Sequence, residues 1–432
     1  MDPGGPILRR ELRLLPLAAI VFFNVSGGPY GIEDTVSSFG PGLALVLLVL
    51  TPFVWSLPVS LAMSELASAI PDEGGYVTWV RRAFGPFWSF QVGWWSWVDS
   101  FVDVAVYPAL FVEYLALWRG EMGTLERWAI ALAFIWLLTG LNLLGVRPTG
   151  QGAVVLAVLS LAPVVALTVT GFAQARTVPW RPWSAGEQGL AAIGLGLAVT
   201  MWNYSGWDTP ATVLGETRAP ERAFRRALFL TLPVIALAYV LPVAAALSAG
   251  ADWSKWTTGS LPVIAREVGG PALGYAVGIG ALLSTSGLFL ALLLTNSRLP
   301  YVLARDGQFP SWLATIGARF GTPWPAVIAS AVLYSAFSAF SFKELIVLNV
   351  WLYSISLLVE LAAFLRLRRL EPELARPYVV PGGHAGALTV TVLPGACALL
   401  AMATAGLLNT LVGVAVALTG PVVYLLRGGS RR

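Results

Sequence analysis

The sequence predicts an all-α polytopic protein, one that crosses a membrane many times. Hydrophobic residues make up 57% of the 432 residues and charged residues only 12%, which is about half the charged fraction of an ordinary soluble protein. Apolar runs of about 20 residues, the length that crosses the hydrocarbon core of a bilayer, recur along the whole chain. No long polar stretch lies between them, so we expect no separate soluble domain.

Twelve apolar segments are long enough to form transmembrane helices. The second, third and eighth are the longest, and we expect them to be tilted or to extend beyond the bilayer. The predicted spans are 14–38, 42–68, 86–117, 126–145, 151–173, 188–214, 226–249, 271–299, 324–341, 344–366, 386–406 and 408–426. We expect one transmembrane domain over residues 1–432, made of a five-span half at 14–173, a second at 188–366 and two additional helices at 386–426.

The positive charges predict the orientation of this bundle. With twelve spans, all but seven of the 27 Lys and Arg residues fall on the side that carries both termini. Loops with such an excess face the cytoplasm, so we expect a multi-pass protein of the cytoplasmic (plasma) membrane with both termini in the cytoplasm. The net charge of +4 then reflects loops beside anionic lipid rather than nucleic-acid binding. The N-terminus shows no signal-peptide cleavage site.

The sequence contains no recognisable catalytic or metal-binding group. Its single cysteine, Cys397, and its single histidine, His384, lie in different segments, and neither is part of a nucleophile motif. We therefore expect a protein that is not an enzyme and has no metal, cofactor or obligate protein partner.

Two spans are interrupted at equivalent positions. The first span contains NVSGGPYG at 24–31 and the sixth contains NYSGWDTP at 203–210, and both share the pattern N-x-S-G followed by a proline. A helix broken inside a bilayer leaves backbone N–H and C=O groups unpaired, which is tolerated only where the break lines a cavity. Interruptions at the same place in two halves indicate the substrate site of a secondary transporter, although an ordinary proline kink is the alternative.

Acidic residues lie within or at the edges of several spans, whereas no Lys or Arg lies deep in any of them. A site that holds cations or protons has this composition. Glu33, Asp34 and Asp208 follow the two breaks and are candidates for proton or cation coupling, or alternatively for capping the next half-helix. The remaining embedded acids are Glu65, Asp99, Asp103, Glu113 and Glu360; of these, Glu113 and Glu360 are expected near the membrane interfaces.

The third span places Asp99, Asp103 and Tyr107 at intervals of four residues. On one continuous helix they share a face, which should turn away from lipid. Asp99 and Asp103 are therefore candidates for a proton relay, although a hydrogen-bonded packing role is equally consistent with Asp99. Trp202, beside the second break, is the tryptophan that we expect to face an ammonium group.

Several motifs resemble the amino acid–polyamine–organocation transporters. FFNVSGGPYGIED, ASAIPDEGGYVTWVRRAFGPFWSFQVGWW and WNYSGWDTPATVLGETRAPERAF are similar to the polyamine uptake branch of that superfamily, as is the pattern DxxxYPxLFxEY that begins at Asp103. The loop at 304–326 resembles the link between the eighth and ninth spans of the superfamily. The match extends over about the first 330 residues.

This resemblance implies a fold and a set of binding residues. It implies an inverted five-plus-five repeat with broken first and sixth helices, two extra helices and transport by alternating access. The substrate-binding residues that it implies, taken with the motifs above, are Asn24, Ser26, Gly27, Gly28, Asp103, Tyr107, Trp202, Asn203, Ser205, Gly206, Asp208 and Leu292.

The chain departs from the branch at several of these positions. Asn24, Leu292 and Asn296 occur where the branch often has acids, so fewer partners remain for a multiply charged polyamine. Ser205 replaces an acid that another branch associates with dibasic amino acids, and the fifth span lacks the lysine of some proton-coupled members.

We expect a secondary active transporter of amino acids or polyamines, driven by protons or by exchange. Its expected partners are a small amine or amino acid, protons and the lipid bilayer. The alternatives are a neutral amino acid permease, a non-transporting receptor on the same fold and an ion channel.

Overall fold

The computed structural model describes residues 7–186, 200–339 and 342–427, with only the backbone described at 342–350. These residues form helices, and they contain no β-strand beyond one isolated bridge between Leu12 and Thr217. Four short helical turns, η1 (Pro52–Ser56), η2 (Thr209–Glu216), η3 (Trp253–Lys255) and η4 (Ser311–Ala314), lie between the α-helices. The α-helices are α1 (Leu14–Val25), α2 (Glu33–Phe39), α3 (Pro41–Thr51), α4 (Leu57–Ala69), α5 (Tyr76–Phe84), α6 (Pro86–Asp103), α7 (Val106–Arg119), α8 (Thr124–Leu143), α9 (Val146–Ala173), α11 (Pro220–Ser248), α12 (Leu261–Asn296), α13 (Arg298–Arg305), α14 (Trp324–Phe337), α15 (Phe342–Leu370), α16 (Gly383–Thr404) and α17 (Leu407–Leu426).

Among the described residues, eight helical segments are long and apolar enough to cross a membrane, and α1 and α14 are shorter apolar helices. The prediction of an all-helical polytopic membrane protein is therefore confirmed. The sixth predicted span, 188–214, begins outside the described residues. The number of twelve spans and the inverted repeat stay predictions.

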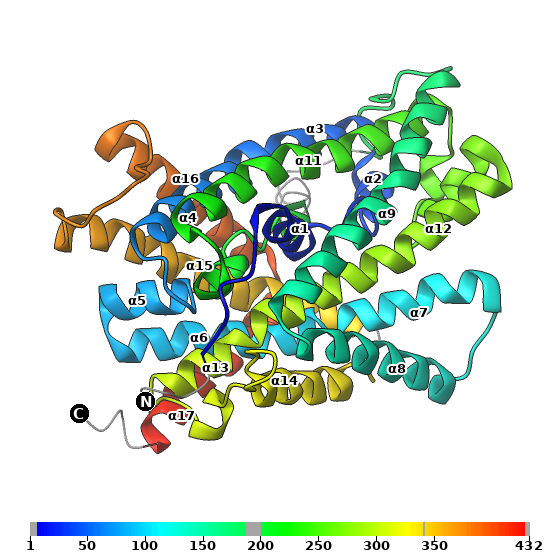
Figure 1. Ribbon diagram of the computed structural model, residues 1–432. Coiled ribbons are helices and arrows are strands. Elements are labelled where there is room, and N and C mark those ends of the chain that lie inside the picture. The colour runs from blue at the N-terminus through cyan, green and yellow to red at the C-terminus, as the bar shows by residue number, and fades with distance from the viewer. Residues whose placement is uncertain (1–6, 187–199, 340–341, 428–432) are drawn as a thin grey trace.

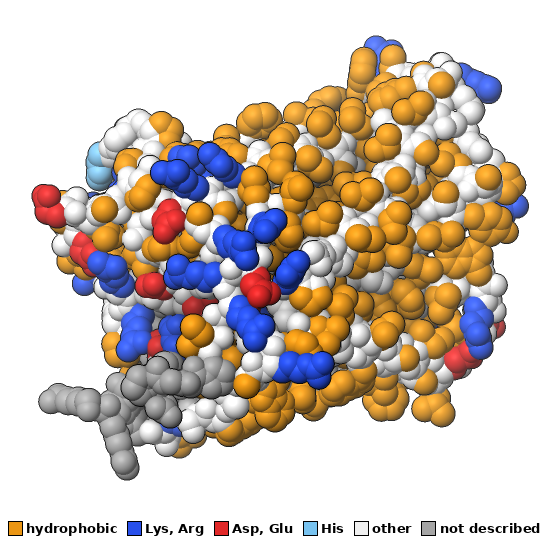
Figure 2. Space-filling view, in the orientation of Figure 1, with side chains coloured by type: hydrophobic (Ala, Val, Ile, Leu, Met, Phe, Trp, Pro, Cys, Tyr) orange, Lys and Arg blue, Asp and Glu red, His pale blue; other side chains and the backbone are white. Residues whose placement is uncertain are grey.

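The helices surround α1, which lies in the middle of the bundle against α9, α11 and α12 (Figure 1). In the same orientation, Figure 2 shows a broad zone of hydrophobic side chains and a concentration of charged side chains at one end of the molecule. Both ends of the described chain lie there, because Arg9 and Arg427 donate hydrogen bonds to the backbone of the same segment, at Ala318 and Gln308. We call this the charged end.

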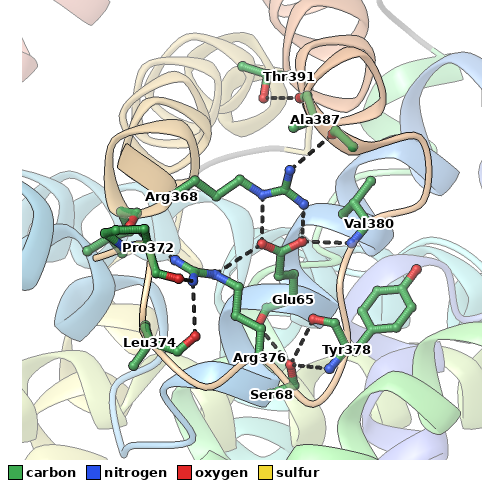
Figure 3. Close-up of polar contacts among 12 residues, drawn as sticks. Glu65, Ser68, Arg368, Pro372, Leu374, Arg376, Tyr378, Val380, Ala387 and Thr391 are labelled. Atoms are coloured by element: carbon green, nitrogen blue, oxygen red, sulfur yellow. Dashed lines mark hydrogen bonds and ion pairs between the residues drawn. The ribbon is translucent and has the colours of Figure 1, made fainter. Parts of the chain in front are cut away.

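A network of ion pairs holds three elements together at the charged end (Figure 3). The carboxylate of Glu65, on α4, accepts hydrogen bonds from Arg368 Nε at 2.8 Å and from Arg368 Nη2 at 2.5 Å. Arg376 Nε lies 3.4 Å from the same carboxylate, and the Val380 N–H donates to it at 2.7 Å. Glu65, one of the predicted embedded acids, is thus fully engaged in connecting α4 to α15 and to the loop before α16.

A second network closes the charged end above the centre of the bundle. Arg298 donates hydrogen bonds from Nε and Nη2 to the two carboxylate oxygens of Glu216, at 2.7 and 3.1 Å, and both side chains are buried. Sequence reasoning found no cation deep in a span, whereas Arg298 begins α13, which continues the apolar helix α12. Each charge of this pair compensates the other, which offsets the cost of burying both side chains.

One predicted continuous helix is interrupted. α6 ends at Asp103 and α7 begins at Val106, so the third predicted span consists of two helices separated by a short turn. Asp99 and Asp103 share a helix as expected, whereas Tyr107 lies on the next one. The expectation of one continuous helix was wrong, although all three residues line one cavity.

Candidate functional site

The first break separates α1 from α2. The N–H groups of Ser26 and Gly27 both donate to the Phe22 carbonyl, and the Gly28 N–H donates to Ser26 Oγ at 3.0 Å. The Gly27 carbonyl accepts from Ser284 Oγ of α12 at 2.6 Å. Gly27 has φ +71°, and a Cβ there would lie 2.6 Å from Leu288 Cδ1. Only glycine fits this backbone conformation and this close approach of α12.

The second break follows a helical turn at 200–203. Its freed backbone groups are paired by two tyrosines: the Asn203 carbonyl accepts from Tyr239 Oη at 2.8 Å, and the Gly206 N–H donates to Tyr353 Oη at 3.0 Å. Trp207 is buried, and its indole N–H donates to the Tyr204 carbonyl. The costly polar groups of a broken helix are thus satisfied by side chains from α11 and α15.

The two breaks touch each other directly. Gly206 has φ +96°, and a Cβ on it would lie 2.3 Å from the Asn24 carbonyl oxygen. The Asn24 side chain is held by α12, because its Oδ1 accepts a hydrogen bond from Thr295 Oγ1 at 2.8 Å. The matching interruptions in the sequence therefore form one structural unit in the middle of the bundle.

A cavity lies beside this unit, between α1, α6, α7, α11, α12, α15 and the second break. Three carboxylates, Asp99, Asp103 and Asp208, line it, and no Lys, Arg or His is among the described lining residues. The lining residues are Asn24, Val25, Ser26, Tyr30, Gly31, Tyr76, Ser96, Asp99, Ser100, Asp103, Val106, Tyr107, Leu110, Trp202, Asn203, Ser205, Gly206, Asp208, Thr209, Tyr239, Leu288, Leu292, Asn296 and Tyr353. This cavity has the composition of a cation site.

The carboxylates of the cavity differ in their partners. Asp208 Oδ1 accepts a hydrogen bond of 2.7 Å from Tyr353 Oη. Asp99 is 8% exposed, and its Oδ1 has no hydrogen-bond partner among the residues that the structure describes. A buried carboxylate oxygen without a donor is costly, so Asp99 offers an acceptor that a ligand can use.

The structure brings most of the predicted binding residues together. Ten of the twelve line the cavity, while Gly27 and Gly28 do not. The glycines shape the break instead of contacting the cavity. Of the five residues expected to couple protons or cations, Asp99, Asp103 and Asp208 line the cavity.

Glu33 and Asp34 lie away from the cavity and hold a loop. The Glu33 carboxylate accepts from the Gly31 N–H at 2.8 Å and from the Leu261 N–H, at the start of α12, at 2.9 Å. Asp34 accepts from the N–H and the hydroxyl of Thr258, at 2.9 and 2.5 Å. Both acids lie in the first turn of α2, as the alternative weighed from the sequence expected, and their carboxylates also hold the start of α12 and the loop before it.

Two further embedded acids have different surroundings. Glu113 is 53% exposed and pairs with Arg127, in agreement with a position near an interface. Glu360 is 1% exposed, and neither of its carboxylate oxygens has a hydrogen-bond partner within the described residues. α5, α6 and α16 pack around α15 and enclose Glu360, while its position near a membrane interface stays a prediction.

Sequence reasoning missed the tyrosines of the site. Tyr30, Tyr76, Tyr239 and Tyr353 all line the cavity, and the last two pair the backbone of the second break. A hydroxyl-bearing ring in an otherwise apolar helix, as in ALAYVLP at 236–242, was the available indication.

Comparisons with known proteins agree with this geometry. The model of the family described as amino acid permease matches residues 12–424. The chain is 34% identical to polyamine transporter RMV1 of Arabidopsis thaliana over 416 residues, covering 96% of this chain and 84% of the relative. It is 34% identical to polyamine transporter PUT1 of Oryza sativa subsp. japonica over 426 residues, covering 98% and 80%.

A more distant relative is bacterial. An uncharacterised transporter of Mycobacterium bovis is 25% identical over 333 residues, covering 77% of this chain and 74% of the relative. The family match spans both breaks and the cavity between them. The chain therefore belongs to the amino acid permease family, and it is a membrane transporter rather than an enzyme.

Proposed function

We propose that this protein carries small amines across the cytoplasmic membrane by alternating access, coupled to protons or by exchange. The observation that carries this proposal is the cavity beside the two broken helices, which presents three carboxylates and no described cationic side chain. An ammonium group is the ligand that such a cavity compensates best, with Trp202 and the tyrosines supplying ring faces. The names of the two plant relatives, both polyamine transporters, point the same way.

The breaks themselves favour an amine over an amino acid. A substrate carboxylate is usually received by free N–H groups at the ends of broken helices. Here the N–H groups of Ser26, Gly27 and Gly28 bond within the first break, and that of Gly206 bonds to Tyr353. These four donors of the two breaks therefore already have partners in the protein.

A second candidate is an amino acid substrate. It is favoured by the neutral residues Asn24, Leu292 and Asn296, all of which line the cavity at positions where the polyamine branch often has acids. With these acids replaced, the cavity has fewer partners for a long, multiply charged amine.

The arrangement in the membrane is part of the proposal. We infer two inverted halves at 14–173 and 188–366, two additional helices at 386–426, and the charged end in the cytoplasm. The excess of arginines in the predicted loops of that end supports this orientation.

Binding of matched ligand pairs to the purified protein tests the substrate class. Putrescine is compared with ornithine, and agmatine with arginine, at two pH values, so that each pair differs by one carboxylate. Tight binding of the amines supports the proposal, whereas binding of only the carboxylate-bearing members makes the protein an amino acid permease. Saturable flux with trans-stimulation in proteoliposomes then distinguishes a carrier from a receptor or a channel.

A variant pair makes the binding experiment specific to the cavity. Asp99→Asn should weaken binding of the amines, because it removes the carboxylate that has a free oxygen. Glu113→Gln is the control, since that acid is exposed and already paired with Arg127.

A further inference from the structure

Glu360 is a buried acid that the substrate cavity does not use. It lies on α15, seven residues after Tyr353, which places both side chains on the same face of the helix two turns apart. It is 1% exposed, and both of its carboxylate oxygens lack a hydrogen-bond partner among the described residues. Glu65 shows what an ionised acid receives elsewhere in this bundle: two arginines and a backbone N–H.

Acidic and phenolic groups, not cations, surround Glu360. Asp208, of the same charge, acts on Glu360 electrostatically, and both acids act in the same way on Tyr76 of α5. The other titratable groups on this side of α15 are Asp99 and Asp103 of α6 and Tyr353 of α15 itself.

Four arginines of α15 and α5 are engaged elsewhere, and Arg369, near the end of α15, is exposed. Arg366 Nε donates to the Ala83 carbonyl, Arg368 pairs with Glu65, Arg81 pairs with Asp306 and Arg82 pairs with Glu371. The acid of α7, Glu113, is paired with Arg127, while His384 of α16 is exposed and α17 contributes only Tyr424, which packs on Phe87. Within the part of the chain that the structure describes, an ionised Glu360 would therefore have neither a counter-charge nor a donor, which is among the costliest arrangements in a protein interior.

Neither substrate nor a metal ion explains this acid. Glu360 is not among the residues that line the cavity, although Asp208 and Tyr353 are. Within the described residues, no group of three or more His, Cys, Asp and Glu side chains is arranged to hold a metal ion. The ligand that remains is a proton, which needs no cavity and converts the carboxylate into a neutral group that a buried site tolerates.

We propose that Glu360 is the binding site of the coupling proton, separate from the substrate cavity and linked to it through Asp208 and Tyr353; this rests on the proposed function of proton-coupled transport. In the conformation described, the proton is covalently bound to one carboxylate oxygen of Glu360. When water reaches the site, that O–H bond breaks, the proton passes to water and a carboxylate remains. Its negative charge then repels Asp208, whose position the Tyr353 hydroxyl fixes at 2.7 Å.

The separation has a functional consequence. Because the proton and the ammonium group occupy different acids, both can be bound at the same time, as cotransport requires. If one acid served both, each ligand would displace the other and the protein would exchange substrate for protons.

Transport in two modes tests this assignment. Wild-type protein, Glu360→Gln and the control Glu373→Gln are reconstituted in liposomes and assayed with radiolabelled putrescine, first by exchange at equal pH and then by uptake driven by an imposed pH gradient. Glutamine resembles a permanently protonated glutamate, so Glu360→Gln should keep its melting temperature and its exchange activity. It should lose the stimulation by the pH gradient, while Glu373→Gln, exposed in the loop after α15, should behave as wild type.

The outcomes separate this inference from the function on which it rests. Gradient-driven uptake by Glu360→Gln equal to that of wild type overturns the assignment of Glu360 and leaves the proposed transport intact. A wild-type protein that exchanges putrescine but ignores the gradient overturns proton coupling and this assignment together, whereas a wild type with no flux overturns the proposed substrate.

A second variant covers the case in which Glu360→Gln also loses exchange. Glu360→Asp keeps a titratable carboxyl group and should respond to the gradient with a shifted pH dependence. Loss of exchange in both variants at unchanged melting temperature would assign Glu360 to substrate binding and overturn the proposal.

Discussion

The hydroxyl group of Tyr353 joins α15 to Asp208: it donates to Oδ1 of Asp208 at 2.7 Å, and it accepts the N–H of Gly206 at 3.0 Å. One side chain thereby orients a carboxylate of the cavity and satisfies the backbone of the second break. Because α15 also carries Glu360 on the same face, Tyr353 connects the helix of one acid to the carboxylate of the other.

Removing the Tyr353 hydroxyl should weaken substrate binding. In Tyr353→Phe, Asp208 loses a donor and Gly206 loses an acceptor, and a hydrogen bond to a charged group contributes about 1.5–3 kcal/mol. We expect affinity for the amine to fall roughly 10- to 150-fold, as measured by equilibrium binding to the purified protein. Tyr275→Phe, on an exposed face of α12, is the control and should bind as wild type; equal affinity in the two variants would show that Tyr353 only packs.

Neutralising Asp208 should impair transport without unfolding the protein. Asp208→Asn keeps an acceptor for the Tyr353 hydroxyl but removes a charge from the cavity, and loss of a buried charge partner costs about 2 kcal/mol or more. We expect uptake to fall by about 30-fold or to lose its coupling, with little change in melting temperature. Full uptake with an unchanged pH profile would remove Asp208 from the mechanism.

A bulky residue at Gly27 should abolish binding. Gly27→Leu places a side chain where even a Cβ lies 2.6 Å from Leu288, at a φ of +71° that L-residues rarely adopt. Gly140→Leu is the matched control, because a Cβ on Gly140 of α8 meets no atom within 4 Å. Binding by both variants, measured with the same ligand, would mean that the first break is only a kink.

The stability of the charged end should depend on the protonation of Glu73. This loop residue is 6% exposed, and neither oxygen makes a hydrogen bond of ordinary geometry with described residues. Its burial, together with the charge of Glu216, raises the pKa of Glu73 well above its usual value of 4.5. The folded protein therefore binds this proton more tightly than the unfolded chain, so the contribution of Glu73 to stability is lost as pH rises above about 4.5.

Glu73→Gln should remove this pH dependence. Thermal unfolding of the wild type and the variant is compared across the pH range, with the exposed Glu373→Gln as control. The difference in stability should grow in favour of Glu73→Gln as pH rises, by about 1.4 kcal/mol for each unit by which the pKa is raised. A constant difference across the range would mean that folding does not shift the pKa of Glu73.

Cysteine labelling should place the charged end in the cytoplasm. The chain has a single cysteine, Cys397, so Cys397→Ala provides a background for Glu373→Cys at the charged end and Glu121→Cys between α7 and α8. A membrane-impermeant maleimide applied to intact cells should label only Glu121→Cys. Labelling of Glu373→Cys without permeabilisation would reverse the orientation.

The centre of the site could be predicted from the sequence because its residues depart from the rule of the bilayer. Asn24, Ser26 and Gly206 interrupt apolar runs, and such interruptions persist only where a cavity or another part of the protein satisfies them. The same reasoning found Asp99, Asp103 and Asp208. It could not separate the glycines that line the cavity from Gly27 and Gly28, because the sequence pattern does not indicate which residues of a break face the cavity.

The partners of the acids could not be predicted, since they come from distant parts of the chain. Glu65 accepts from Arg368, 303 residues away, and Glu33 accepts from Leu261, 228 residues away. Nothing in the local sequence around either acid indicates its partner. Glu360 shows the same limit: only the packing of α15 against its neighbours reveals that it is enclosed and has no hydrogen-bond partner among the described residues.

Main-chain hydrogen bonds also connect the residues of the charged end, between Leu12 and the end of η2. The Leu12 N–H donates to the Glu216 carbonyl at 3.0 Å, and the Arg218 N–H donates to the Leu12 carbonyl at 2.8 Å. Side-chain replacements leave these main-chain groups in place, so a mutational scan would not detect these two hydrogen bonds. Proline is the exception, because it lacks the N–H donor. Ordinary substitutions at this end test the packing of Leu12 and the ion pair of Glu216, whereas only proline at position 12 or 218 removes a donor of these two main-chain bonds.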